Sequence, residues 1–189
     1  MRRFFISCSL SMALFAVISV SNVAQAADQM PARVETASGA LVLATNTWQR
    51  ETGLSMVDVG VYAGARLAQR SDFANAAGAK RLRLVPQRAL SADQIGRMLV
   101  RDLAAAGSKA EAAQHMSALV ALGGSFATSK PLAAGDSLGI EYLPGQGVRA
   151  LINDAPVGAF VGDAQFFSLL ARNWVTEPAG ERLVTVAAR

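Results

Sequence analysis

Few residues of this sequence have the type and the spacing that enzyme chemistry requires. The chain holds one histidine, His115, and one cysteine, Cys8. A single histidine excludes a two-histidine metal site such as an HExxH helix, and a Ser-His-Asp triad would have to use His115. Glu111 lies four residues before His115, which falls outside the apolar stripe of its predicted helix. We therefore expect His115 on the surface rather than as a catalytic base.

Two other motifs depend on their structural context. The segment Gly145-x-Gly147-x-x-Ala150 has the letters of a dinucleotide-binding fingerprint. That site needs the N-terminus of a helix, whereas strand-like residues follow here, so we interpret the segment as a hairpin turn. Asp58 lies in an otherwise apolar segment and is either a buried general base or an ion-pair partner of a nearby arginine. We expect no cofactor and no metal.

The first 26 residues have the composition of an export signal. Arg2 and Arg3 precede a nearly uncharged apolar run, which ends at the small-x-small sequence Ala24-Gln25-Ala26. This order predicts a signal peptide over residues 1–26, cleavage after Ala26 and a periplasmic protein. An uncleaved membrane anchor is the alternative, although the apolar run is barely long enough to span a bilayer.

Cleavage would change the chemistry of the remaining chain, residues 27–189, which we expect to form a single domain. Sixteen basic residues would remain against 14 acidic ones, a net charge of +2, and no cysteine would remain. Disulfides, thiolate nucleophiles and Cys-ligated zinc are then excluded. The basic residues are scattered along the chain, so we expect neither a nucleic-acid partner nor a stable membrane span after cleavage. The sequence leaves the oligomeric state open.

Hydrophobic periodicity predicts an α+β domain. Strands are expected near residues 41–43, 54–67, 81–85, 136–143, 148–152 and 157–161, and helices near 91–107, 109–122, 163–174 and 177–186. The strict alternation of 81–85 predicts a half-exposed strand, and Gly123-Gly124 is expected to end the second helix. Two groups of strands flank a helical pair without βαβ alternation, which favours an antiparallel sheet covered by helices.

The ordered elements resemble the chalcone isomerase-like family over about residues 41–183, most specifically over 135–174. The resemblance is carried by Arg50, Val57-Asp58-Val59-Gly60-Val61-Tyr62, Lys80-Arg81-Leu82-Arg83-Leu84 before the Ser91 helix, Gly135-Asp136-Ser137-Leu138, Tyr142-x-Pro144-Gly145-x-Gly147 and Gly158-x-x-x-Gly162. It implies an open-faced sandwich, in which an antiparallel sheet is covered by helices on one face and an apolar cleft lies between the two layers.

The resemblance also implies two kinds of function. Catalytic members in plants close a chalcone to a flavanone, with an arginine that guides the phenolate and hydroxyl groups that stabilise the enolate. Other members bind fatty acids, with the same arginine facing the carboxylate. By position, Arg50 matches this arginine, Val57 replaces a hydroxyl-bearing threonine, Ile95 lies near the catalytic tyrosine, and Asp102 lies near a polar asparagine. An apolar side chain cannot stabilise an enolate.

Three hypotheses follow for the domain. The first is a non-catalytic protein that binds a small apolar or anionic ligand, such as a fatty acid, in the cleft between sheet and helices. Its ligand-binding residues would be Arg50, Val57, Val59, Ile95, Met98 and Asp102. The alternative is an isomerase, an intramolecular lyase of chalcone isomerase type acting on a phenolic or enone substrate, with Arg50 as the best catalytic candidate and Asp58, Asp102 or Tyr62 assisting. In the third, the cleft is filled and the domain is structural or interacts with another protein. For Arg50 alone, the alternative to a binding role is a surface residue without a ligand.

Overall fold

Alternating apolar and polar residues build one antiparallel sheet. The computed structural model describes residues 30–127, 130–176 and 184–186, so the expected signal peptide and its cleavage site lie outside the described residues. Within the described part of the chain, nine strands join this sheet. They are β1 (Arg33–Thr36), β2 (Gly39–Leu43), β3 (Thr47–Glu51), β4 (Met56–Ala63), β5 (Lys80–Pro86), β6 (Leu138–Leu143), β7 (Gly147–Ile152), β8 (Ala155–Val161) and β9 (Val184–Val186).

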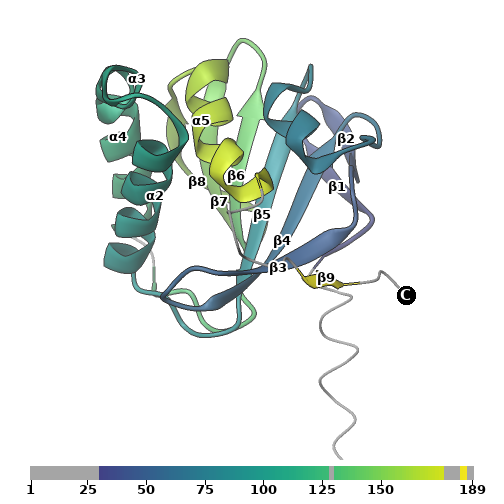
Figure 1. Cartoon of the computed structure of the whole chain (residues 1–189), viewed down its shortest axis with the longest axis horizontal. Coiled ribbons are helices and arrows are strands. Elements are labelled where there is room, and N and C mark those ends of the chain that lie inside the picture. The colour runs from purple at the N-terminus through teal and green to yellow at the C-terminus, as the bar shows by residue number, and fades with distance from the viewer. Residues whose placement is uncertain (1–29, 128–129, 177–183, 187–189) are drawn as a thin grey trace, which may run out of the picture.

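The strands are ordered β1-β2-β4-β5-β6-β7-β8, and every neighbouring pair is antiparallel. Strand β3 pairs with the first half of β4, and β9 pairs with β3. The sheet curls into a half-barrel, with β1 and β2 at one end and β8 at the other (Figure 1). A turn at Asn153 and Asp154 joins β7 to β8, and both residues have the positive φ typical of a tight hairpin.

Helices cover one face of this sheet, as predicted. They are α2 (Ala92–Ala106), α3 (Lys109–Gln114), α4 (Met116–Ala127) and α5 (Ala164–Val175), with a 3-10 turn η1 (Arg70–Asn75) beside α5. Ser91 and Gln94 form a capping box at the start of α2, and Asp163 caps α5 by accepting a hydrogen bond from the Phe166 amide. The fold is therefore the α+β arrangement of an antiparallel sheet with a helical layer (Figure 1).

The main core lies between the sheet and the helices. On β4, Val57, Val59 and Val61 point into it, whereas Tyr62 belongs to a second, smaller apolar cluster with Val34 and Leu41. Since successive side chains of a strand point to opposite faces, β4 is buried on both sides. Val57, Val59 and Val61 thus share one face of β4, and Tyr62 lies on the other.

The prediction of a half-exposed strand at 81–85 is wrong. All seven residues of β5 are buried, and Arg81 is only 2% exposed. The curled β1–β2 end of the sheet lies over the polar face of β5. This is shown by the hydrogen bond that the Arg81 guanidinium donates to the backbone oxygen of Glu35 in β1 (2.8 Å). A polar alternation therefore marks a covered face of charged groups here, not a solvated one.

The predicted helix at 109–122 is two helices, and two predictions on it are wrong. The first helix ends at His115, and α4 runs through Gly123 and Gly124 to Ala127. The break changes which side faces the core, so that Met116 and Val120 are exposed. His115 is buried and stacks on the Phe166 ring, with 5.7 Å between ring centroids. It is therefore not the surface residue predicted from the sequence.

The predicted last helix at 177–186 is wrong over its final residues. Val184–Val186 forms β9, which pairs with β3 in antiparallel register, and residues 177–183 lie outside the described part of the chain. This pairing places the C-terminal segment against β3, the strand that carries Arg50.

Candidate functional site

Arg50 lies between the sheet and the helices rather than on the outer surface. It pairs with Val57 across β3 and β4, and cross-strand partners point to the same face of a sheet. Because Val57 faces the main core, Arg50 also faces the helical layer. Its guanidinium lies over the Trp174 ring of α5, 5.4 Å from the ring centroid, and its Nη2 donates a long hydrogen bond to Asn173 Oδ1 (3.4 Å).

Asp102 lies beside Arg50 as a fully buried carboxylate. This residue of α2 has 0% of its surface exposed. Its oxygens accept hydrogen bonds from Asn173 Nδ2 (2.7 Å), from the Trp174 indole (2.8 Å) and, at 3.5 Å, from the adjacent Arg101. Asn173 therefore connects the two charges, since its amide oxygen accepts from Arg50 while its nitrogen donates to Asp102.

The environment of Asp102 opposes its ionisation. Burial raises the pKa of this carboxyl, whereas the positive charge of Arg101, the hydrogen bonds from Asn173 and Trp174, and the charge of Arg50 act in the opposite direction. The desolvation effect is the largest of these, so the pKa of Asp102 remains above the usual value for aspartate. Burial and the surrounding donors and cations therefore act in opposite directions on the ionisation of Asp102.

The four apolar residues predicted to bind ligand are all buried between sheet and helices. They are Val57, Val59, Ile95 and Met98. Val57 and Met98 border a small apolar cavity that is too narrow to admit a water molecule. The other residues that line it are Leu84, Pro86, Leu90, Leu132 and Leu138. Two larger surface hollows, of about 330 and 660 Å³, have none of the predicted ligand-binding residues in their lining.

Two residues named as possible helpers of Arg50 lie on the other face of β4. Asp58 accepts a hydrogen bond from Gln49 Nε2 (2.7 Å), and Tyr62 contacts the Met30 sulfur through its hydroxyl (3.9 Å). Burial raises the pKa of Tyr62 to about 12, which keeps its hydroxyl protonated at neutral pH. The structure thus brings Asp102 to Arg50 but separates Asp58 and Tyr62 from it by the sheet.

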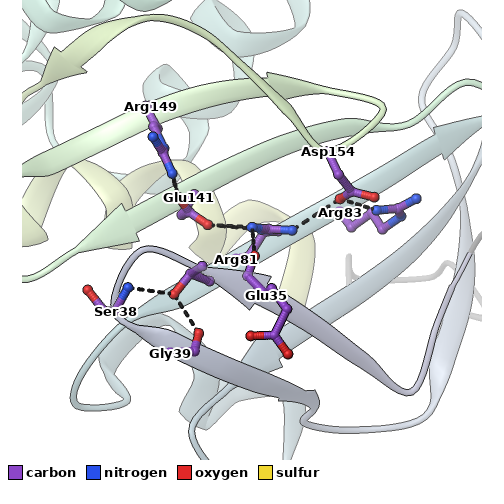
Figure 2. Close-up of polar contacts among 9 residues, drawn as sticks. Glu35, Ser38, Gly39, Arg81, Arg83, Glu141, Arg149 and Asp154 are labelled. Atoms are coloured by element: carbon purple, nitrogen blue, oxygen red, sulfur yellow. Dashed lines mark hydrogen bonds and ion pairs between the residues drawn. The ribbon is translucent and has the colours of Figure 1, made fainter.

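A second group of buried charges lies on this opposite face and was not predicted. Glu141 accepts hydrogen bonds from Arg81 (2.6 Å) and Arg149 (2.7 Å), and Asp154 pairs with Arg81 and Arg83 (Figure 2). Arg81, Glu141 and Arg149 are direct cross-strand neighbours on β5, β6 and β7. Their opposite charges could have been recognised in the sequence once the strand register was known. The arrangement joins the strands through saturated ion pairs, which suits a structural role.

The letters G-x-S-x-G occur at Gly135–Gly139, with Ser137 at their centre. A nucleophile elbow requires a strand before the serine and a helix after it. Here Ser137 directly precedes strand β6, its side chain is buried, and its amide donates to Asn153 Oδ1 (2.8 Å). Residues 135–137 are therefore a loop that leads into β6 and is joined to the β7–β8 turn, without the geometry of a nucleophile elbow.

Within the ranges that the structure describes, no three His, Cys, Asp or Glu side chains gather closely enough to hold a metal ion. Among those same ranges, no helix has both the length and the apolar character needed to cross a bilayer.

A family model described as chalcone isomerase-like matches residues 23–184, most of the chain. The chain belongs to the chalcone isomerase-like family. The sequence resemblance and the predicted fold class are both confirmed. No curated protein sequence matches this family member significantly.

The chalcone isomerase-like domain is also similar to the crystal structure of a fatty-acid binding protein from Arabidopsis thaliana. The TM-score is 0.55 and the sequence identity 17%, and the match covers 75% of this chain and 81% of the plant protein. At this identity the similarity concerns the fold: a curled antiparallel sheet with helices on one face.

Proposed function

We propose that this chalcone isomerase-like domain is an exported, non-catalytic protein that binds a fatty-acid-like ligand between its sheet and helices. One observation carries the proposal: Arg50, a cation within the apolar layer, is the cross-strand partner of Val57, which borders the small apolar cavity. An acyl chain would enter that cavity, and its carboxylate would bind the Arg50 guanidinium. Arginine is well suited to this because its planar donors match the geometry of a carboxylate.

The cavity must widen to hold an acyl chain. Met98 of α2 borders it, and methionine adapts its shape easily because it is unbranched and flexible. Leu90 and Leu132, on the loops that join α2 and β6 to the rest of the domain, form an isolated pair of backbone hydrogen bonds at the cavity wall. A shift of these three side chains would open the space without breaking the sheet.

Two further points favour a binder over an isomerase. Val57 and Ile95, at the positions where the resemblance places hydroxyl donors, are buried apolar side chains that cannot stabilise an enolate. The similar plant structure is named a fatty-acid binding protein, which supports the same kind of ligand for this chain. Export is proposed from the composition of residues 1–26.

The binding proposal is tested by titrating palmitate against the protein from Ala27 onward and against two variants. Arg50→Gln keeps much of the side-chain size but removes the charge. Arg97→Gln is the matched control, because Arg97 is exposed on α2 and pairs with Asp93. We expect Arg50→Gln to weaken palmitate binding about tenfold or more, which corresponds to ~1.4 kcal/mol, and to leave hexadecanol binding nearly unchanged.

The outcomes separate the parts of the proposal. Equal palmitate affinity in Arg50→Gln and in the unchanged protein would remove the role of Arg50, and no binding to either would refute the binding function. Export is tested by fractionating cells that express the full chain and by mass spectrometry of its N-terminus. A protein that begins at Ala27 in the periplasmic fraction is expected, and an intact N-terminus in the membrane fraction would contradict it.

A further inference from the structure

The buried carboxylate of Asp102 lies within the proposed ligand site, next to the cation that the ligand would use. We infer that Asp102 determines the charge of what this site accepts: an anionic amphiphile enters together with one proton, which Asp102 takes up, whereas a neutral amphiphile enters without it. This inference rests on the proposed function. It assigns the specificity for charge to Asp102 and predicts that ligand binding is accompanied by the uptake of one proton, which can be measured.

The ionisation of Asp102 depends on the charged and polar groups that surround it. Three elements supply them: Arg101 from its own helix α2, Arg50 from β3, and the neutral donors Asn173 and Trp174 from α5. Arg101 is half-exposed, and its Nη1 donates a hydrogen bond to the Thr52 backbone oxygen (2.7 Å). Its charge is therefore partly screened by water. Among the residues that the structure describes around Asp102, Arg50 is thus the less screened cation, and Asn173 links it to the buried carboxylate.

A ligand anion changes this balance. Its carboxylate would share Arg50 with Asp102, so that two negative charges would face one enclosed cation. Like charges in one buried site disfavour double ionisation, and the pair titrates as a coupled unit. Burial already opposes the charged form of Asp102. The simplest way to restore neutrality is therefore for a proton from water to bind the Asp102 carboxylate, with no bond to the ligand formed or broken.

Asn173 offers a route by which the hydrogen bonds can follow this change. In the present arrangement its amide oxygen accepts from Arg50 and its nitrogen donates to an Asp102 carboxyl oxygen. If the amide turns over, the oxygen can accept the new Asp102 proton while the nitrogen donates to the ligand anion beside Arg50. The Trp174 indole can continue to donate to the other oxygen of Asp102. Every polar group then keeps a partner, as a buried site requires.

The experiment needs an anion whose own charge is constant with pH. Decanesulfonate, kept below its micelle concentration, is the anionic probe, and 1-decanol is the neutral one. Calorimetric titrations at one pH, in two buffers with different ionisation enthalpies, count the protons taken up on binding. Affinities are then measured from pH 5 to 8. The variants are Asp102→Asn and the control Asp93→Asn, an exposed acid of the same helix.

We expect the unchanged protein to take up close to one proton with decanesulfonate and none with decanol. Its sulfonate affinity should rise by up to tenfold for each unit that the pH falls, as linkage requires for one proton. Asp102→Asn should take up no proton, bind decanesulfonate with an affinity independent of pH, and bind it at least tenfold more tightly at pH 7. Asp93→Asn should behave as the unchanged protein does.

Proton counting on the unchanged protein decides the question even if Asp102→Asn does not fold. Sulfonate binding without proton uptake would overturn the role of Asp102 and leave the binding function intact. Failure of decanesulfonate, decanol and palmitate to bind would refute the binding function itself. Infrared difference spectra give an independent readout, because a protonated carboxyl band should appear when decanesulfonate binds. The absence of that band, with a proton nevertheless taken up, would place the proton elsewhere and overturn the inference.

Discussion

Removal of the Glu141 side chain should destabilise the domain more than the loss of any exposed charge. Glu141 is fully buried on the curled face of the sheet and pairs with both Arg81 (2.6 Å) and Arg149 (2.7 Å). In Glu141→Ala, Arg81 stays buried and loses its principal carboxylate partner. It keeps its contacts with Asp154 and with the backbone oxygen of Glu35, which reduce the penalty (Figure 2).

The size of the effect follows from this geometry. Removing one partner of a buried pair costs about 3–5 kcal/mol, and the contacts that Arg81 retains favour the lower end of that range. For a domain of this length, ~3 kcal/mol corresponds to a fall in Tm of roughly 6–12 °C. The control is Asp93→Ala, which breaks an exposed pair with Arg97 and should cost less than about 0.5 kcal/mol.

Urea unfolding of the protein from Ala27 onward measures the free energy of unfolding of both variants. An unchanged slope of the transition with urea concentration shows that the unfolded state is the same in each. A triple variant, Arg81→Met with Glu141→Leu and Arg149→Leu, replaces the charges by apolar groups of similar size. We expect it to recover most of the lost stability, because buried ion pairs can often be exchanged for apolar packing. The reasoning fails if Glu141→Ala costs no more than Asp93→Ala.

Three further predictions concern single positions. Absorbance titration should show one tyrosine ionising near pH 12, and Tyr62→Phe should abolish that phase; a phase that persists in the variant would contradict the assignment. Gly147→Ala should cost more than ~2 kcal/mol in urea unfolding, because its φ is +109° and a Cβ would lie 2.7 Å from the Gly162 oxygen, whereas Gly145→Ala, with open space, should cost about 1 kcal/mol. Burial raises the pKa of Asp102, so ionisation of this carboxyl lowers the stability of the folded state. As the pH rises from 3 to 7, the unchanged protein should therefore lose free energy of unfolding relative to Asp102→Asn. A difference that stays constant with pH would exclude this.

Local signals in the sequence were enough to predict much of the fold. The capping box at Ser91 fixes the start of α2, and the apolar period places Ile95, Met98 and Leu103 on its buried side. The turn at Asn153 and Asp154 and the alternation in β4 depend only on neighbouring residues. These features are predictable because the physical causes, hydrogen-bond capping and side-chain periodicity, act within a few residues.

The features that were missed depend on contacts between distant segments. The polar sequence Thr47-Trp48-Gln49-Arg50-Glu51 has no strand pattern of its own and becomes β3 by pairing with β4 and β9. The buried face of β5 likewise requires the curled β1–β2 end of the sheet to lie over it. An alternating charged strand has the same local pattern whether its polar face meets water or other charges. Only the long-range arrangement distinguishes the two.

Arg50 and Arg81 differ in the described contacts around their charges, and the placement of the proposed ligand site follows from this difference. Arg81 is held directly by the carboxylates of Glu141 in β6 and Asp154 in the β7–β8 turn, so any ligand would have to displace strong ion pairs. Arg50 reaches the Asp102 carboxylate through the amide of Asn173, which donates at one end and accepts at the other. A neutral amide can exchange its partners at little electrostatic cost, whereas a carboxylate cannot leave a buried arginine. For this reason we place the ligand site at Arg50, although the charges around Arg81 are more numerous.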